Sequence, residues 1–446
     1  MSQILVKKFY QKGYAIYILL LIVLVTIKNS IAPAWYDILA QVAIFIFSYV
    51  ILEVFINKKV SIVTWISIFC FQVIASLIFY WINISIYNDP LGHNPVDAEF
   101  YRDLGLRFQN KSLYELYGYL LFDGNSIDDF GYPTIVYLFY KIFIDYGHEL
   151  LMLFNALIIS IGSCLIYKLA LNFIPGIYSR LAALLWGTAS FATCTTVENL
   201  KENFFSFIII VSFFCLYKYY DNRKQIYLII SIISGICVFF FRIASGMMLL
   251  MSIISIFFIS NQYIYRKLKT VIVIGGIMGI LMFPIVTTFV LEQRGYDYEG
   301  SRSVTAERIE EDGGLIAVFT NFTSAFIGPI PNFVHKNIDL VKSITRYSFT
   351  AFIKMMLSFY FLYALVNFIR KRYVKMIPIL IFAILNIVLL IFTFYSMHVR
   401  YHWPHIPLFL IISLWGMYNI ESRKIIKYNR LYTIMICTLI ILFNLR

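Results

Sequence analysis

The chain is dominated by long, almost uninterrupted apolar runs, and these limit its fold more than any other feature. A helix needs about 20 apolar residues to cross the hydrocarbon core of a bilayer, and runs of that length recur along the 446 residues. Of all residues, 61% are hydrophobic and 14% are charged, whereas a soluble domain has about 45–50% and about 25%. The sequence therefore predicts an all-α polytopic membrane protein and excludes a soluble, disordered or disulfide-rich secreted protein.

The apolar runs predict about 13 transmembrane helices in a single transmembrane domain that takes in the whole chain, residues 1–446. The first run follows three lysines and is not followed by the small residues of a cleavage site, so we expect it to be retained as a span. The predicted spans are residues 14–30, 37–56, 61–86, 149–170, 180–195, 203–220, 226–242, 246–264, 270–290, 348–369, 376–396, 405–420 and 430–445.

The charge of the chain follows the same topology. Lys and Arg number 37 against 24 Asp and Glu, which gives a formal net charge of +13. With the N-terminus in the cytoplasm, nearly every dense basic cluster falls on the cytoplasmic side, as the positive-inside rule requires. Orientation therefore explains much of the excess, and no nucleic-acid partner is expected. We expect a multi-pass protein integral to a membrane, the bacterial cytoplasmic membrane in the simplest interpretation, with the lipid bilayer as its surroundings.

Two long polar segments, residues 87–148 and 291–347, fall on the non-cytoplasmic side in this topology. Long polar loops between spans often carry function when they are ordered. In the first loop, apolar residues recur at helical spacing from Ala98 onward, which predicts amphipathic helices lying on the membrane surface. This loop is the first place to look for catalytic groups.

Acidic residues of the first loop could perform several tasks. Asp97 stands where the first surface helix would begin, so its carboxylate could cap that helix. It could equally act as a catalytic base beside Glu99, and the two roles are compatible. A site for Mg or Mn could form from Asp97, Glu99 and Asp129, because hard divalent cations prefer oxygen ligands. Asp129 and its neighbours suit a solvated turn equally well.

Ionisable residues also stand at three other predicted span entrances on the non-cytoplasmic side. Such residues are costly there unless they pair or face water. Lys201 could pair with Glu198 or Glu202, or bind a phosphate. Arg242 and Arg400 are better suited to phosphate because of their planar fork of donors. His402 lies beside Arg400 in a turn that favours an anion pocket over a histidine metal site.

These candidate acids and cations all map to one face of the predicted membrane domain. A flippase or an ion-coupled transporter would place such charges near the bilayer midplane. Their collection at the interface favours an enzyme that acts on a lipid-linked substrate.

Short motifs in the same positions resemble those of the GT-C superfamily of membrane glycosyltransferases, in particular its dolichyl-phosphate-mannose/ArnT-like family. The resemblance covers most of residues 60–420. The chain departs from many relatives in having two spans, rather than one, before the span that leads into the first loop. The motifs are Val96-Asp97-Ala98-Glu99-Phe100-Tyr101, Gly131-Tyr132-Pro133, Leu200-Lys201-Glu202 and the segment Arg400 through Pro407.

The resemblance implies a GT-C fold and transfer of a sugar from a polyprenyl-phosphate or pyrophosphate donor. The acceptor would be a glycan, lipid or protein of the cell envelope. Asp97 would be the catalytic base or a metal ligand, with Glu99 as its partner, and no cofactor beyond a divalent cation is implied. The residues expected to bind the substrate and its phosphate are Tyr101, Lys201, Glu202, Arg242, Arg400 and His402.

Other functions remain open at this point. A polymerase that joins lipid-linked polysaccharide repeat units would use the same lipid with a larger acceptor channel. A flippase or transporter of lipid-linked oligosaccharides would move the lipid without chemistry. A non-catalytic membrane partner of a polysaccharide assembly complex would do neither.

Overall fold

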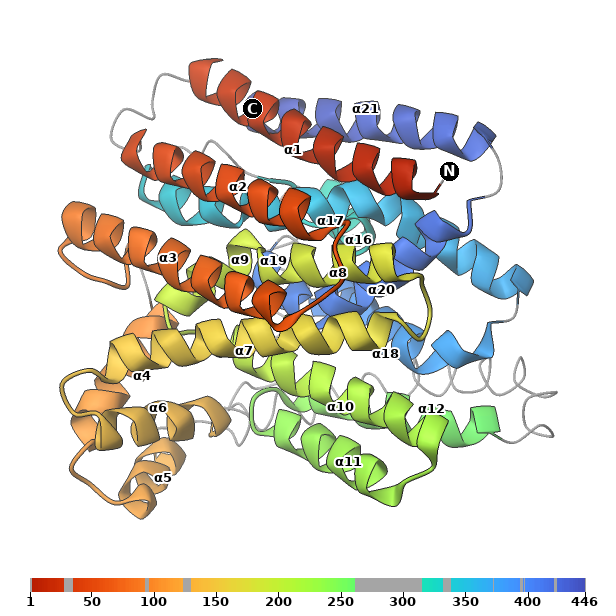
Figure 1. Cartoon of the computed structure of the whole chain (residues 1–446). Coiled ribbons are helices and arrows are strands. Elements are labelled where there is room, and N and C mark those ends of the chain that lie inside the picture. Colours follow the sequence, from red (N-terminus) through yellow and green to blue (C-terminus); the bar gives the residue numbers. More distant parts are fainter. Residues whose placement is uncertain are drawn as a thin grey trace.

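The computed structural model describes residues 2–27, 35–92, 96–122, 130–260, 315–331, 338–371, 373–393, 396, 398–420 and 423–445. Throughout these ranges the regular structure is helical, and no strand occurs in them (Figure 1). The prediction of an all-α protein is therefore confirmed. The predicted span 270–290 and Asp129 lie outside the described residues.

The helices follow one another closely along the chain. In order they are α1 (Ser2–Ile27), α2 (Trp35–Phe55), α3 (Ile62–Tyr87), α4 (Val96–Phe108), α5 (Leu113–Phe122), α6 (Gly131–Ile142), α7 (Gly147–Ala170), α8 (Gly176–Gly187), α9 (Ser190–Val197), α10 (Glu202–Asn222), α11 (Gln225–Phe239), α12 (Ile243–Ser260), α16 (Leu315–Ile327), α17 (Ile338–Lys371), η3 (Val374–Met376), α18 (Ile377–Thr393), α19 (Val399–His402), η4 (Trp403–His405), α20 (Ile406–Tyr418) and α21 (Arg423–Leu445).

Seven helices of the described chain are long and apolar enough to cross a membrane. They lie within α2, α3, α7, α10, α17, α18 and α21. A polytopic helical membrane protein is therefore supported, while the larger number of spans stays a prediction. Two of the predicted spans are shorter than expected. The segment 180–195 is divided between α8 and α9, and α20 has only 13 residues.

The division between α8 and α9 has a polar partner from another helix. Irregular backbone at membrane depth is tolerated only where its polar groups are satisfied by protein or water. The fully buried Gln72 of α3 donates from its amide nitrogen to the Gly187 carbonyl at 2.7 Å. Its amide oxygen accepts from the Thr193 hydroxyl of α9 at 3.2 Å. One side chain thus joins both sides of the break.

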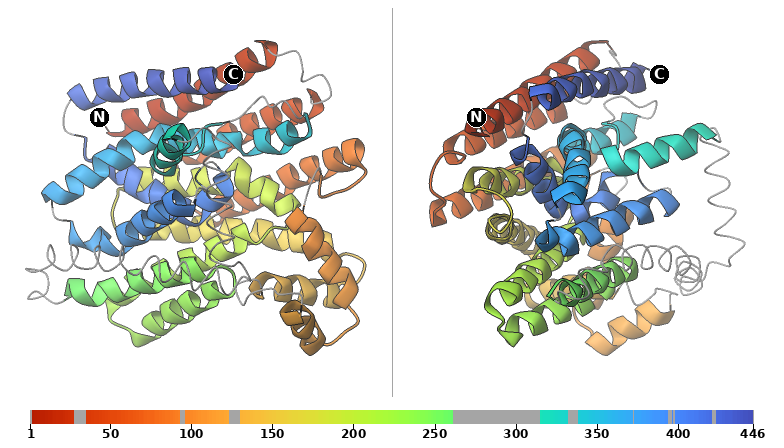
Figure 2. Two further views of the ribbon diagram at one scale, coloured as in Figure 1. Left: turned by 180° about the vertical axis from the view of Figure 1, so that it is seen from behind. Right: turned by 90° about the vertical axis from the view of Figure 1, so that its right-hand side faces the viewer.

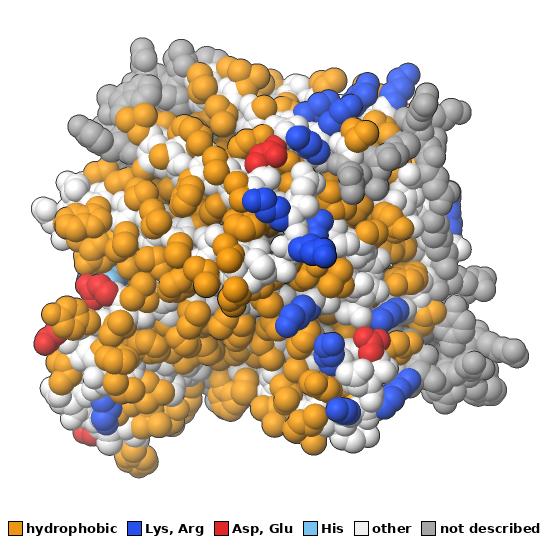
Figure 3. All heavy atoms as spheres, viewed as in Figure 1, with side chains coloured by type: hydrophobic (Ala, Val, Ile, Leu, Met, Phe, Trp, Pro, Cys, Tyr) orange, Lys and Arg blue, Asp and Glu red, His pale blue; other side chains and the backbone are white. Residues whose placement is uncertain are grey.

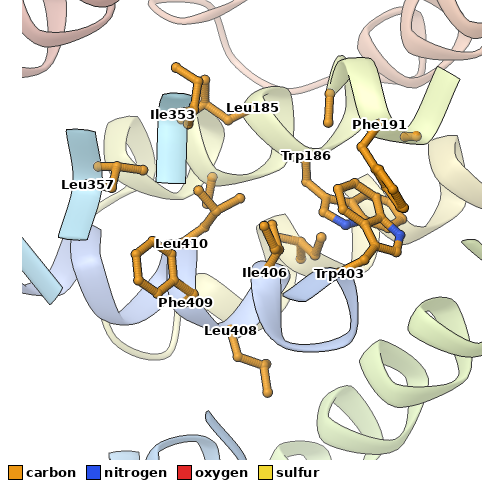
Figure 4. Packing of buried hydrophobic residues seen from close by; sticks show 14 of the residues in the cluster. Leu185, Trp186, Phe191, Ile353, Leu357, Trp403, Ile406, Leu408, Phe409 and Leu410 are labelled. Atoms are coloured by element: carbon orange, nitrogen blue, oxygen red, sulfur yellow. The ribbon is translucent and has the colours of Figure 1, made fainter. Parts of the chain in front are cut away.

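The long helices run side by side, with α8 and α20 in the interior and α1, α2 and α21 in an outer layer (Figures 1 and 2). Trp186 of α8 stacks on Trp403 at 5.7 Å between ring centroids, and Phe191 of α9 packs on the same ring at 4.9 Å (Figure 4). Residues Ile406 to Met417 of α20 are all buried. A helix that is apolar on all sides belongs in the core, and α20 occupies it.

The outer surface has the character of a lipid-facing surface. Hydrophobic side chains cover most of the face in view, and its Lys and Arg side chains gather toward one side (Figure 3). Helices α4, α5 and α6 lie at the opposite end (Figure 1). The two short helices expected after Ala98 are therefore present as α4 and α5, and they share a small core with α6. That core contains Leu104, Phe108, Leu116, Leu120 and Tyr137.

Candidate functional site

Three of the predicted site residues meet at one point. Arg400 of α19 contacts Asp97 of α4 through Nη1 and Oδ2. Its Nε donates to Oε1 of Glu202, the first residue of α10. One guanidinium thereby joins α19 to residues that lie 198 and 303 positions earlier in the chain, Glu202 and Asp97. Val96 opens α4, so Asp97 lies within its first helical turn and not at the cap.

The three charged groups differ in their access to solvent. The Glu202 side chain is fully buried, that of Arg400 is 27% exposed and that of Asp97 is 45% exposed. Burial lowers the pKa of Arg400, but the attraction of Glu202 and Asp97 more than offsets it, so the pKa lies well above its usual range. The guanidinium is therefore a permanent charge. The second oxygen of Glu202, Oε2, is buried without a hydrogen-bond partner among the described residues.

Arg242, between α11 and α12, lies close to this cluster. Its guanidinium carbon stands 5.0 Å from the ring centroid of Tyr401 and 5.4 Å from that of Phe205. Both rings belong to residues near the cluster in sequence, since Tyr401 follows Arg400 and Phe205 lies in the first turn of α10 with Glu202. Stacking on aromatic faces fixes the orientation of the planar guanidinium of Arg242.

Lys201 and Tyr101 lie near the cluster of Asp97, Glu202 and Arg400. Lys201 is the residue that caps α10 and is 8% exposed. Tyr101 is 5% exposed and packs edge-on against Tyr132, with 4.9 Å between ring centroids. The Tyr132 hydroxyl donates to the Asn199 carbonyl at 2.7 Å, which ties the start of α6 to the turn before α10.

Gly131 explains part of the Gly-Tyr-Pro motif. Its backbone N–H donates to the Phe240 carbonyl at 2.8 Å. A β-carbon at this position would stand 2.8 Å from that same oxygen, which no real side chain tolerates. Only glycine therefore allows α6 to begin against the end of α11, next to Arg242.

A second polar pair, Glu198 and Tyr347, lies near the first cluster and is not identified by the sequence interpretation. The Tyr347 hydroxyl of α17 donates to both oxygens of Glu198, at 3.0 and 2.8 Å. Burial raises the pKa of the Glu198 carboxyl to about 7, against the opposing effects of Tyr347, Arg346 and Arg400. Arg346 donates to Asn83 of α3 at 2.7 Å. A carboxyl that titrates near neutral pH is suited to proton transfer.

The signal for this pair was present but ambiguous in the sequence. Glu198 had been interpreted only as an ion-pair partner of Lys201. Arg346 and Tyr347 stand at the entrance of the predicted span 348–369, where a cation also serves as an ordinary anchor. The contact of Tyr347 with Glu198 spans 149 residues of sequence and could not be deduced from spacing.

Two predicted site residues lie apart from this cluster. The carboxylate of Glu99 is 54% exposed and stands 3.6 Å from Arg102, a weak surface pair. His402 is fully buried, and both of its ring nitrogens already have protein partners: Lys354 Nζ at 2.5 Å and the Ser396 carbonyl at 2.6 Å. The side chain of His402 therefore offers no nitrogen to a phosphate.

The predicted cation site would draw on Asp97 and Glu99. Oδ2 of Asp97 is engaged by Arg400, and Glu99 lies beside Arg102. Among the residues that the structure describes, no three His, Cys, Asp or Glu side chains are grouped as metal ligands would be. The two carboxylates are of the right chemical type for Mg or Mn, but both are matched with arginines, so a divalent cation stays a prediction.

An apolar groove of about 600 Å³ is lined in part by the residues that precede Arg242. Its walls come from α5, α6, α10 and α11, and Phe240 and Phe241 precede Arg242 directly in the chain. The lining residues are Tyr117, Phe130, Gly131, Thr134, Ile135, Phe204, Phe207, Ile208, Val211, Ile233, Ser234, Cys237, Phe240 and Phe241. A groove with such an apolar lining suits a hydrocarbon chain.

Comparison of the chain with models of known protein families, with curated protein sequences and with solved structures found no match. The function must therefore be argued from the arrangement of these side chains alone.

Proposed function

We propose that the chain is a membrane glycosyltransferase of the GT-C type. In this proposal it transfers a sugar from a polyprenyl-phosphate or pyrophosphate donor to an acceptor on the non-cytoplasmic face of a bacterial cytoplasmic membrane, in cell-surface glycan synthesis. One observation carries the proposal: a half-exposed carboxylate, Asp97, is held by Arg400, and a second arginine, Arg242, stacks on Tyr401, the residue after Arg400. Arg242 also directly follows Phe240 and Phe241, which line an apolar groove.

The reaction follows from the positions of the charges. Oδ1 of Asp97, the oxygen not held by Arg400, takes the proton of an acceptor hydroxyl as the acceptor oxygen bonds to the anomeric carbon. The bond from that carbon to the phosphate oxygen breaks, and its electron pair leaves with the lipid phosphate. Arg242 and Lys201 stabilise the charge that develops on this leaving group. General-base assistance contributes about 10²–10⁴-fold to such a step.

The groove accounts for the lipid part of the donor. A volume of about 600 Å³ is within the range of binding sites for drug-sized ligands. The isoprenoid units nearest the phosphate would lie along α10 and α11, and the rest of the chain would extend into the bilayer. The head group would then meet Arg242, and the sugar would lie toward Asp97.

The test is transfer of a labelled sugar from a polyprenyl-linked donor by the purified full-length protein in lipid bilayers. We expect Asp97→Asn to lower kcat by about 10²–10⁴-fold, because the amide cannot accept the proton. Asp103→Asn is the matched control, since Asp103 is on the same helix and 65% exposed. Full turnover by Asp97→Asn would show the assignment to be wrong. Movement of lipid between leaflets without sugar transfer would show that the protein is a flippase and not a glycosyltransferase.

A further inference from the structure

Arg400 sits on a helix too short to hold it in place. α19 contains only the four residues Val399–His402, which is one turn. A single turn has almost no stability of its own, because the cost of nucleation exceeds the gain from one hydrogen bond. The position of Arg400 against Asp97 therefore depends on contacts made by the rest of α19 and by the residues that directly follow it, such as Trp403, which stacks on Trp186.

The opposite face of α19 makes those contacts through His402. Residues two apart on a helix point about 200° away from each other, so His402 faces inward when Arg400 faces the site. His402 Nδ1 lies 2.5 Å from Lys354 Nζ of α17, and Nε2 lies 2.6 Å from the Ser396 carbonyl. All three residues are buried, with exposed fractions of 2% for Lys354 and 0% for His402 and Ser396.

The partners of the ring fix its protonation. Nζ of Lys354 carries hydrogens to donate whether or not it is charged, so Nδ1 is the acceptor in its contact with Lys354. A carbonyl only accepts, so Nε2 must carry the hydrogen that it donates to Ser396. His402 is therefore neutral in one tautomer, and burial together with Lys354 keeps its pKa well below its usual range.

The contacts continue into a third and a fourth helix. The Ser396 hydroxyl donates to the Asn321 carbonyl of α16 at 2.8 Å, and Asn321 Nδ2 donates to the Ile391 carbonyl of α18 at 2.7 Å. Lys354 Nζ also donates to the Ala325 carbonyl of α16 at 3.3 Å. A buried network in which each member has its partners is rigid, and this one ends on the helix that carries Arg400.

We propose that Lys354 and His402 are positioning residues: their hydrogen bond anchors α19 to α17 and thereby sets Arg400 against Asp97. The part of this inference that concerns turnover rests on the proposed function. The part that concerns the anchoring of α19 does not, because it can be measured without any substrate.

The experiment compares two variants on the same helix. Lys354→Met keeps an unbranched side chain, one atom shorter, and removes the donor, which leaves Nδ1 of His402 without its partner. Ser358→Ala, one turn further along α17, removes a buried hydroxyl bonded to Tyr432 of α21 and is the control. The first measurement is hydrogen–deuterium exchange of the segment 396–405 in the full-length protein, and the second is the kinetics of sugar transfer.

We expect Lys354→Met to speed exchange of the segment by about tenfold or more, as loss of a buried hydrogen bond requires. Ser358→Ala should leave it unchanged. Arg400 contacts the catalytic base Asp97 and not the substrate, so its displacement should affect catalysis more than substrate binding. We therefore expect kcat to fall by about 10-fold to 100-fold, while KM for the lipid donor changes by less than about twofold. His402→Leu removes the acceptor for Lys354 together with the donor to Ser396, so it should reproduce both effects if Lys354→Met does not fold.

Unchanged exchange at 396–405 in both the lysine and histidine variants would overturn the inference. Faster hydrogen–deuterium exchange of this segment together with a wild-type kcat would overturn the conclusion that the hydrogen bond positions Arg400. If the wild-type protein transfers no sugar, the exchange measurement still decides whether the hydrogen bond anchors α19, so failure of the proposed function is told apart from failure of this inference.

Discussion

Removal of the Arg400 guanidinium should destabilise the protein far more than removal of an ordinary surface arginine. In Arg400→Leu, the fully buried Glu202 loses its contact at Oε1, and Oε2 has no partner among the described residues to begin with. A buried charge left without a partner costs about 3–5 kcal/mol. Asp97 adds less than about 1 kcal/mol, because its side chain is 45% exposed and water replaces the lost contact.

A control variant separates the cost of leaving Glu202 unpaired from the cost of removing any arginine side chain. Arg102 also pairs with a carboxylate, Asp89, at 2.9 Å, but the two side chains are 23% and 32% exposed. Arg102→Leu should therefore cost less than about 1 kcal/mol. The double variant Arg400→Leu with Glu202→Leu should recover most of the loss, because an apolar pair of similar volume replaces the buried ions without an orphaned charge.

Equilibrium unfolding of the purified proteins in mixed micelles measures these differences in the free energy of unfolding. A cost below about 1 kcal/mol for Arg400→Leu would refute the reasoning. A double variant whose loss of unfolding free energy equals the sum of the losses of the two single variants would also refute it. The cost of Arg400→Leu would then not come from leaving Glu202 without its partner.

Two further predictions concern the surroundings of the site. In the folded protein the pKa of Glu198 is raised from 4.5 to about 7, so the folded state retains a proton that the unfolded state loses, and stability should fall as pH rises through this window. The fall contributed by this group is at most about 3 kcal/mol, and Glu198→Gln should abolish it in unfolding experiments at pH 5 and pH 8. Gly131→Ala should destabilise by about 1–3 kcal/mol because its β-carbon meets the Phe240 carbonyl. Gly118→Ala of α5, which meets nothing within 4 Å, should stabilise by up to about 1 kcal/mol in the same experiment.

Hydropathy and helical spacing predicted the class of the fold and the placement of α4. Local signals were sufficient there, since apolar runs of span length and the recurrence of apolar residues after Ala98 are properties of neighbouring residues. The sequence also assigned Asp97, Glu202 and Arg400 to one candidate site, and the structure brings these side chains into contact. The underlying reason is scarcity, because charged residues at predicted span entrances are few.

The interior of the helix bundle was not predictable in the same way. A hydropathy average over 180–195 does not register the break at Thr188 and Ala189, because the residues on both sides are apolar. His402 was interpreted as a phosphate ligand because its partner, Lys354, lies 48 positions away on another helix. Contacts of this kind depend on which helices become neighbours, and one sequence alone does not contain that information.

The bridge made by Gln72 bears on how the protein is assembled in the membrane. During synthesis, α3 is made more than 100 residues before the break between α8 and α9, since Gln72 and Gly187 are 115 positions apart. Chains emerge N-terminus first. The Gln72 amide that binds the Gly187 carbonyl is therefore already made when α8 and α9 follow. The order of the helices along the chain therefore makes the partner available before the irregular backbone has to meet lipid.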